Sequence, residues 1–215
     1  MFLNLIKNLG TSLGFLILYI FLTAISYLIF NDYAISSLTS SIGTSLIIGF
    51  IYRDYLKEKI KTIKKDFRIK SFINALIAIA MVFVLDYMLI KIFGSTSENE
   101  KLVEKLIKSS PIIYGINAVL ITPLTEEFIF RLPYRNKYKG ASLLISCLVF
   151  SGVHLSKLSE IVYILPYLLL SLGIGINYFK TDNIYISYFV HVLNNLINMI
   201  LLMWWWYERQ EEKKE

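Results

Sequence analysis

Long stretches without a charged residue constrain this chain more than any other feature. A helix that crosses a bilayer needs about 20 mostly apolar residues, and such segments recur along the whole sequence. They cover residues 8–31, 33–52, 71–90, 109–125, 140–156, 161–179 and 183–207, and Asp86 is the one charged residue within them. Charged residues make up only 18% of the chain, whereas a soluble domain has about a quarter. The pattern predicts an all-α, polytopic transmembrane helical bundle with about seven spans, or eight if one segment is broken or re-entrant.

A single integral membrane domain is expected over residues 1–215, because this length suits one domain. The first apolar segment is longer than the core of a typical signal peptide and lacks a small-residue cleavage site. We therefore expect it to stay in the protein as a span. Cys147 is the single cysteine and lies in an apolar run, so a small buried residue is the simplest interpretation.

The loops between these segments differ in charge, and this difference predicts the orientation. Residues 53–70 hold eight basic and three acidic residues, and residues 131–139 hold four basic residues and no acidic one. The connection at 91–108 is nearly balanced, with four lysines and three glutamates. By the positive-inside rule the first two loops and the N-terminus are cytoplasmic and the C-terminal tail is outside. The net charge of +6 therefore reflects membrane orientation, and no nucleic-acid partner is expected.

Three charged residues stand in an apolar neighbourhood at 122–135, TPLTEEFIFRLPYR. Ionisable residues inside a membrane segment are costly and usually functional, although such residues at a helix end can also contact headgroups. Glu127 and Arg131 are four apart, so they share a helix face and can form an ion pair. Glu126 points elsewhere and is left available as a general base or acid.

The two histidines of the chain also lie in or beside apolar segments. His154 ends the stretch FSGVH, and His191 begins HVLNN. Asn195 is four residues after His191, so the two share one face of a helix. Either histidine alone could be a hydrogen-bonded packing residue, but both lie with the glutamate pair in the last four helices.

Three short motifs in a fixed order carry a resemblance to a known family. The motifs are Glu126-Glu127-x-x-x-Arg131, Phe150-x-x-x-His154 and His191-x-x-x-Asn195. In this order, on separate apolar helices, they resemble the CAAX-protease and bacteriocin-processing (CPBP, or Abi) family of intramembrane glutamic endopeptidases. The resemblance covers about residues 111–200, which would form the catalytic core.

The resemblance implies a role for each motif residue. Glu126 and His154 would together activate a water molecule. His191 and Asn195 would stabilise the oxyanion that forms when this water attacks a peptide carbonyl. A positioned donor of this kind contributes about 3 kcal/mol to transition-state stabilisation.

The supporting residues would be Glu127, Arg131 and Phe150, and no cofactor is expected. Two histidines and two glutamates could also bind zinc with an open position for water. However, the chain has no HExxH motif, and Arg131 beside Glu127 opposes binding of a cation. The metal-free glutamate mechanism is therefore preferred over a zinc site.

The expected function is that of an intramembrane endopeptidase surrounded by membrane lipid. Its substrates would be peptides or lipid-modified protein tails, and it could act in bacteriocin self-immunity in a bacterial plasma membrane. We expect the active-site cavity to face the cytoplasm, because Glu126 and His191 lie near the cytoplasmic ends of their predicted helices. The alternatives are a non-catalytic immunity or scaffold protein that binds a peptide, sensor kinase or transporter, and a small transporter, although no inverted repeat is visible.

The sequence also raises questions about the depth of His154, the surroundings of Asp86 and the role of two glycines. An ideal helix over 140–154 would place His154 ~20 Å from the cytoplasmic end, so either this helix begins near residue 145 or its boundary differs. Asp86 either faces the cavity or is satisfied by a neighbouring helix. Gly173 and Gly175 are expected to permit close packing of helices.

Overall fold

The computed structural model describes residues 2–94, 96–135 and 139–211. Every regular element in these ranges is a helix, which confirms the all-α prediction. The elements in chain order are α1 (Phe2–Phe30), α2 (Tyr33–Ile51), α3 (Arg53–Asp66), α4 (Ile69–Phe93), α5 (Glu98–Ser109), α6 (Pro111–Ile116), the π-helical η1 (Asn117–Ile121), α7 (Thr122–Phe130), the 3₁₀ turn η2 (Leu132–Tyr134), α8 (Lys139–Val153), the 3₁₀ segment η3 (Leu158–Tyr163), α9 (Ile164–Thr181) and α10 (Ile184–Glu211).

All seven apolar segments of the sequence correspond to helical segments. Within the described residues, six of them are long and apolar enough to cross a membrane. These six are Phe2–Phe30, Tyr33–Ile51, Phe72–Phe93, Pro111–Tyr134, Leu158–Thr181 and Ile184–Trp204. The seventh is α8, which has only 15 residues. The architecture is therefore that of a polytopic helical membrane protein.

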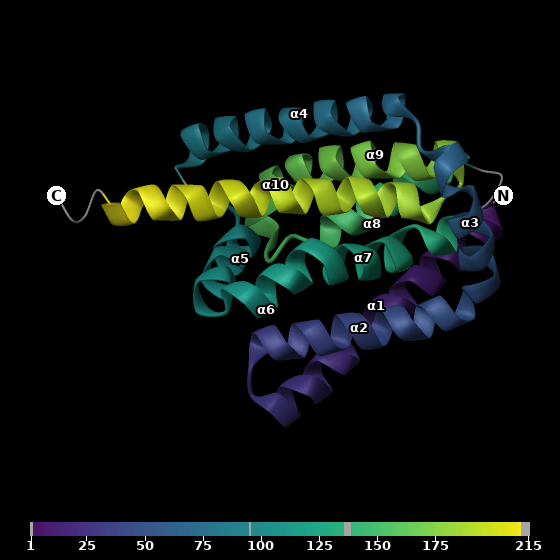
Figure 1. The fold of residues 1–215 in the computed structure, drawn as a ribbon, viewed down its shortest axis with the longest axis horizontal. Coiled ribbons are helices and arrows are strands. Elements are labelled where there is room, and N and C mark those ends of the chain that lie inside the picture. The colour runs from purple at the N-terminus through teal and green to yellow at the C-terminus, as the bar shows by residue number, and fades with distance from the viewer. Residues whose placement is uncertain (1, 95, 136–138, 212–215) are drawn as a thin grey trace.

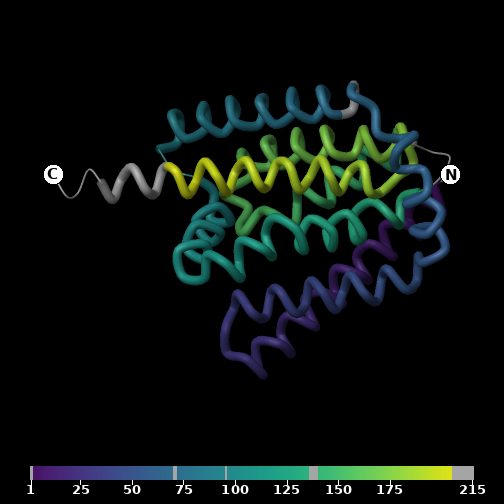
Figure 2. Tube along the Cα trace, viewed as in Figure 1, coloured from purple at the N-terminus to yellow at the C-terminus, as the bar shows by residue number. Residues whose placement is uncertain are grey.

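The long helices lie roughly along one common direction (Figure 1). α1 and α2 form an antiparallel pair on one side, and α4 packs against α9 on the other, as the trace in Figure 2 also shows. α10 contacts both α9 and α7. The short helices α3 and α5 lie at opposite ends of the bundle (Figure 1).

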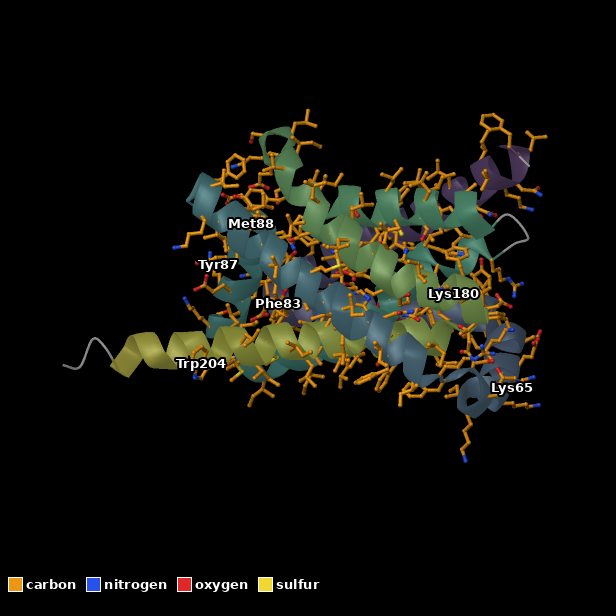
Figure 3. The ribbon with its side chains drawn as sticks, turned by 90° about the horizontal axis from the view of Figure 1, so that it is seen from above. Lys65, Phe83, Tyr87, Met88, Lys180 and Trp204 are labelled. Atoms are coloured by element: carbon orange, nitrogen blue, oxygen red, sulfur yellow. The ribbon has the colours of Figure 1, made fainter. Side chains whose placement is uncertain are left out.

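The basic loops meet at the end that carries α3. The guanidinium of Arg135 lies 5.4 Å from the ring of Tyr52 and 5.0 Å from that of Tyr55. Lys59 Nζ lies 2.9 Å from a carboxylate oxygen of Asp182, in the α9–α10 turn. We call this end, formed by residues 53–68, Arg135 and residues 180–183, the basic end. Figure 3 shows Lys65 and Lys180 there and Trp204 toward the opposite end.

Polar contacts hold the Ser- and Thr-rich α2 against α7. The hydroxyls of Ser45 and Thr125 lie 2.8 Å apart, and Thr125 also donates to the carbonyl of Ser41 at 3.0 Å. All three residues are buried. In an apolar medium such hydroxyl pairs hold helices together, which explains why this span is less apolar than its neighbours.

The two glycines of α9 allow close packing, as predicted. A Cβ atom added at Gly173 would overlap the side chain of Ala78 on α4. One added at Gly175 would come within 2.7 Å of Leu143 on α8. α9 can therefore lie tightly between α4 and α8, and its position brings Arg131 and the histidine-bearing helices together.

Candidate active site

The glutamate pair follows a π-helical turn. η1 contains i→i−5 hydrogen bonds, and such π-bulges often occur at functional sites. α10 covers the carbonyls of this turn, because Asn195 donates from Nδ2 to the carbonyl of Ala118 at 2.9 Å. Tyr188 donates from its hydroxyl to the carbonyl of Leu120 at 3.1 Å. Asn195, predicted as an oxyanion donor, is therefore fixed against the helix that carries Glu126. Its side-chain amide has a second N–H, which does not bind the carbonyl of Ala118.

Glu127 and Arg131 form the buried pair that their spacing predicted. Nε of Arg131 lies 3.5 Å from Oε2 of Glu127, and both side chains are fully buried. The other guanidinium nitrogens donate to the hydroxyl of Ser146 and to the hydroxyl of Ser171, the latter at 2.8 Å. Arg131 thus connects α7 to α8 and α9 at the centre of the bundle.

Glu127 also contacts His191, a contact that the sequence did not predict. Oε1 of Glu127 lies 3.0 Å from Nδ1 of His191. A carboxylate accepts here, so the proton of the imidazole sits on Nδ1. Nε2 of the same ring then faces Glu126, whose Oε2 is 3.4 Å away. His191 therefore lies between the two adjacent glutamates.

Glu126 faces both histidines and is the more accessible carboxylate. Its side chain is 19% exposed, whereas that of Glu127 is 0% exposed. Oε1 of Glu126 lies 3.8 Å from Nε2 of His154. Nδ1 of His154 lies 2.7 Å from the carbonyl of Phe150. Since a carbonyl can only accept, Nδ1 donates, and neutral His154 presents a lone pair on Nε2 toward Glu126.

Two aromatic rings hold the imidazole of His154. The ring centroid of Phe150 lies 4.5 Å from that of His154, and it also contacts His191 at 5.8 Å. Tyr167 of α9 stacks on His154 with a centroid distance of 4.8 Å. The Tyr167 hydroxyl accepts from the side-chain amide of Asn99 at 3.0 Å, which ties it to α5. No sequence signal separated Tyr167 from other aromatic residues in apolar helices.

The structure decides where α8 begins and how deep the site lies. α8 begins at Lys139, so the helix does not start near residue 145, and His154 follows its last residue directly. Glu126 is four residues before Phe130, the end of α7, and eight before Tyr134, the end of its span, or ~12 Å along the helix. His191 is seven residues after the start of α10 at Ile184. Both residues are therefore nearer the ends of their spans that reach the basic loops, and His154 meets them from the far end of α8.

The site opens into a cavity of about 560 Å³. Glu126, His154, His191 and Asn195 all line it, and so does Asp86, which therefore faces the cavity. The cavity continues along α5, whose residues form much of its wall. Among the described residues, none of the basic end lines it. The expectation that the cavity faces the cytoplasm stays a prediction.

Asn194 is the neighbour of Asn195 and lies in the same wall. It is 2% exposed and donates from Nδ2 to Oδ1 of Asn195 at 3.0 Å. Within the described part of the chain, no group of three or more His, Cys, Asp or Glu residues is arranged to hold a metal ion.

The segment that carries the three motifs is similar to a known protein family. Residues 108–197 match the model of the Rce1-like family, described as type II CAAX prenyl endopeptidase Rce1-like. The segment that carries the motifs is therefore similar to this family. This match confirms the resemblance carried by the three motifs, since every motif residue lies within it.

One curated relative extends the similarity beyond this segment. The "Putative membrane peptidase YdiL" of Bacillus subtilis (strain 168) is 24% identical over 177 residues, which are 77% of this chain and 70% of that protein. No solved structure matches the chain. Both findings support a membrane protease as the broad class to which this protein is similar.

Proposed function

We propose that this protein is an intramembrane endopeptidase that hydrolyses a peptide bond with Glu126 and His154. The observation that carries the proposal is the convergence of the three motifs in one cavity. Nε2 of His154 lies 3.8 Å and Nε2 of His191 lies 3.4 Å from the carboxylate of Glu126. In this arrangement Glu126 can accept a proton from water and His154 can accept the second hydrogen bond of the same water. His191 can donate a hydrogen bond to the oxygen on which negative charge develops.

The first step forms the bond between water and the peptide carbonyl carbon. A water molecule between Glu126 and His154 donates one O–H to the carboxylate and the other to the lone pair on Nε2. Glu126 takes the first proton as the water oxygen attacks, and the carbonyl π electrons move onto oxygen. General base catalysis of this kind contributes about 10²- to 10⁴-fold.

The oxyanion is then stabilised by His191 and Asn195. His191 can donate from Nε2 only when both ring nitrogens carry protons, because Nδ1–H already goes to Glu127. Glu127 orients the ring through this hydrogen bond, and Arg131 in turn holds Glu127. Asn195 donates its second amide N–H. As the C–N bond breaks, Glu126 returns its proton to the leaving nitrogen, and the second water proton stays on the new carboxyl group.

The substrates in this proposal are peptides or lipid-modified protein tails. The name of the matching family points to prenylated tails, and a membrane-embedded site is also suited to peptide processing or bacteriocin self-immunity in a bacterial plasma membrane. A cavity of about 560 Å³ can hold an extended peptide segment of a few residues.

The test is cleavage of a peptide panel by the purified full chain in detergent. The panel contains leader peptides and isoprenylated tetrapeptide tails, each with a fluorogenic bond. We expect Glu126→Gln and His154→Ala to lose at least about 10²-fold in kcat. Glu58→Gln makes the same chemical change on an exposed residue of α3 and should retain full activity.

The outcomes separate the proposal from its alternatives. Activity that persists in a chelator supports the metal-free glutamate mechanism, and activity lost in a chelator and restored by zinc supports a zinc site instead. Full activity in both cavity variants contradicts the assigned roles. If the well-folded wild-type protein cleaves no peptide of the panel, the non-catalytic scaffold becomes the better interpretation.

A further inference from the structure

The candidate site is closed toward the basic end by an apolar cluster. Beyond Glu126, the chain continues toward the basic end through Phe128, Phe130 and Leu132, all buried. These residues pack with Tyr178 and with Ile184 at the start of α10, and they belong to one buried cluster. We call this cluster the apolar plug. It lies between Glu126 and the loops at the basic end.

The site is open in the opposite direction. From Glu126 and His191, the cavity continues past Tyr33 at the start of α2 and Asn99 in the first turn of α5. It also reaches Leu202, in the distal half of α10. α5 and the beginning of α2 lie at the end of the bundle opposite α3 (Figure 1). The accessible side of the active site is therefore the α5 end.

The charge distribution assigns these two ends to the two sides of the membrane. The basic end, residues 53–68, Arg135 and residues 180–183, holds nine basic and four acidic residues (seven plus one plus one, and three plus zero plus one). The connection at 91–108, which contains α5, holds four basic and three acidic residues. An excess of lysine and arginine marks the cytoplasmic loops, so the basic end is cytoplasmic.

We infer that the substrate reaches Glu126 and His154 from the non-cytoplasmic side of the membrane. This inference rests on the proposed function for its substrate class, which is then an exported peptide or a protein segment held at the outer leaflet. A cytoplasmic protein tail cannot enter along the cavity in this orientation, because the apolar plug separates it from the active site.

Site-directed labelling tests the direction of access without any assay of activity. Cys147 is the single cysteine and is fully buried. All labelling variants carry Cys147→Ala, so that any label reports the introduced cysteine alone. Ala118→Cys and Asn198→Cys place a thiol in the cavity, and Lys61→Cys places one on exposed α3 at the basic end. Two independent cavity positions keep the test usable if one variant does not fold.

Each variant is treated with a membrane-impermeant maleimide in intact spheroplasts and in inverted membrane vesicles. We expect the cavity thiols to react at least tenfold faster in spheroplasts, and Lys61→Cys to react at least tenfold faster in inverted vesicles. Cavity thiols that react only in inverted vesicles, together with Lys61→Cys, overturn the inference. Cavity thiols that react from neither side overturn it as well.

A second experiment links access to catalysis and separates the two proposals. The protein is reconstituted in vesicles of known orientation, and the fluorogenic peptide is added to one side. Cleavage is expected only when the peptide is on the side of the α5 end. Outward labelling without any cleavage would count against the proposed function alone, whereas cleavage from the side of the basic end would count against the direction of access alone.

Discussion

Replacing Arg131 by methionine would leave the carboxylate of Glu127 buried without its guanidinium. Both side chains are fully buried, and their charged atoms lie 3.5 Å apart. Removal of one partner from a buried ion pair typically costs about 3–5 kcal/mol, because the other charge stays desolvated. The variant also leaves the hydroxyls of Ser146 and Ser171 without their donor. A loss of about 4 kcal/mol corresponds to a fall of roughly 8–16 °C in the unfolding midpoint for a chain of this length.

The single buried cysteine provides the assay. Cys147 is fully buried in the folded protein, so a thiol-reactive fluorophore reports its exposure on heating. Glu127→Gln/Arg131→Met removes both charges of the pair. We expect the double variant to lose less free energy of unfolding than the two single variants lose when added together. The difference should be at least about 2 kcal/mol, because the double variant leaves no unpaired buried charge.

An exposed ion pair provides the matched control. Lys101 lies 2.9 Å from Glu98, and the two side chains are 48% and 43% exposed. Lys101→Met should therefore change the stability by at most about 1 kcal/mol. If Arg131→Met lowers the midpoint no more than Lys101→Met, or if the double variant equals the sum of its parts, the reasoning about a buried pair is refuted.

Three further predictions concern other parts of the structure. Gly173→Leu should separate α4 from α9 and destabilise the protein by about 1–3 kcal/mol through overpacking, measured with the same thermal assay; an unchanged midpoint would contradict the close packing. Tyr167→Leu removes the ring stacked on His154, so we expect the His154 Cε1 proton to shift downfield in NMR spectra and kcat to fall more than KM rises; an unchanged resonance would refute the stacking. Burial raises the pKa of Asp66, but hydrogen bonds, first of all from Asn183, outweigh it and lower this pKa below 3.8. The resulting stabilisation is present above the unfolded pKa and lost as the pH falls through the lower folded pKa, so Asp66→Asn should be less stable than wild type at pH 6 and equal to it in strong acid.

The sequence predicted those features that depend on one helix at a time. Hydropathy located all seven apolar helices, because the bilayer imposes a minimum length on each span. The spacing of Glu127 and Arg131 predicted their ion pair, because residues four apart share a face of a helix. The boundary of α8 was less certain, since hydropathy does not mark where a helix stops within an apolar run.

The contacts between helices required the tertiary structure. Glu127 and His191 are 64 residues apart, and neither hydropathy nor helical period tells which face of α7 meets which face of α10. The stacking of Tyr167 on His154 likewise depends on how α9 is rotated against the end of α8.

The direction in which the cavity opens is the feature for which sequence and tertiary structure contribute most differently. The sequence by itself determined that this chain is a helical membrane bundle with a strongly basic end and a set of acid–base residues in its second half. Only the tertiary structure decided that an apolar plug closes the basic end and that the cavity runs toward α5. Charge patterns act on each loop separately, whereas a cavity is formed by the space that side chains from several helices leave between them.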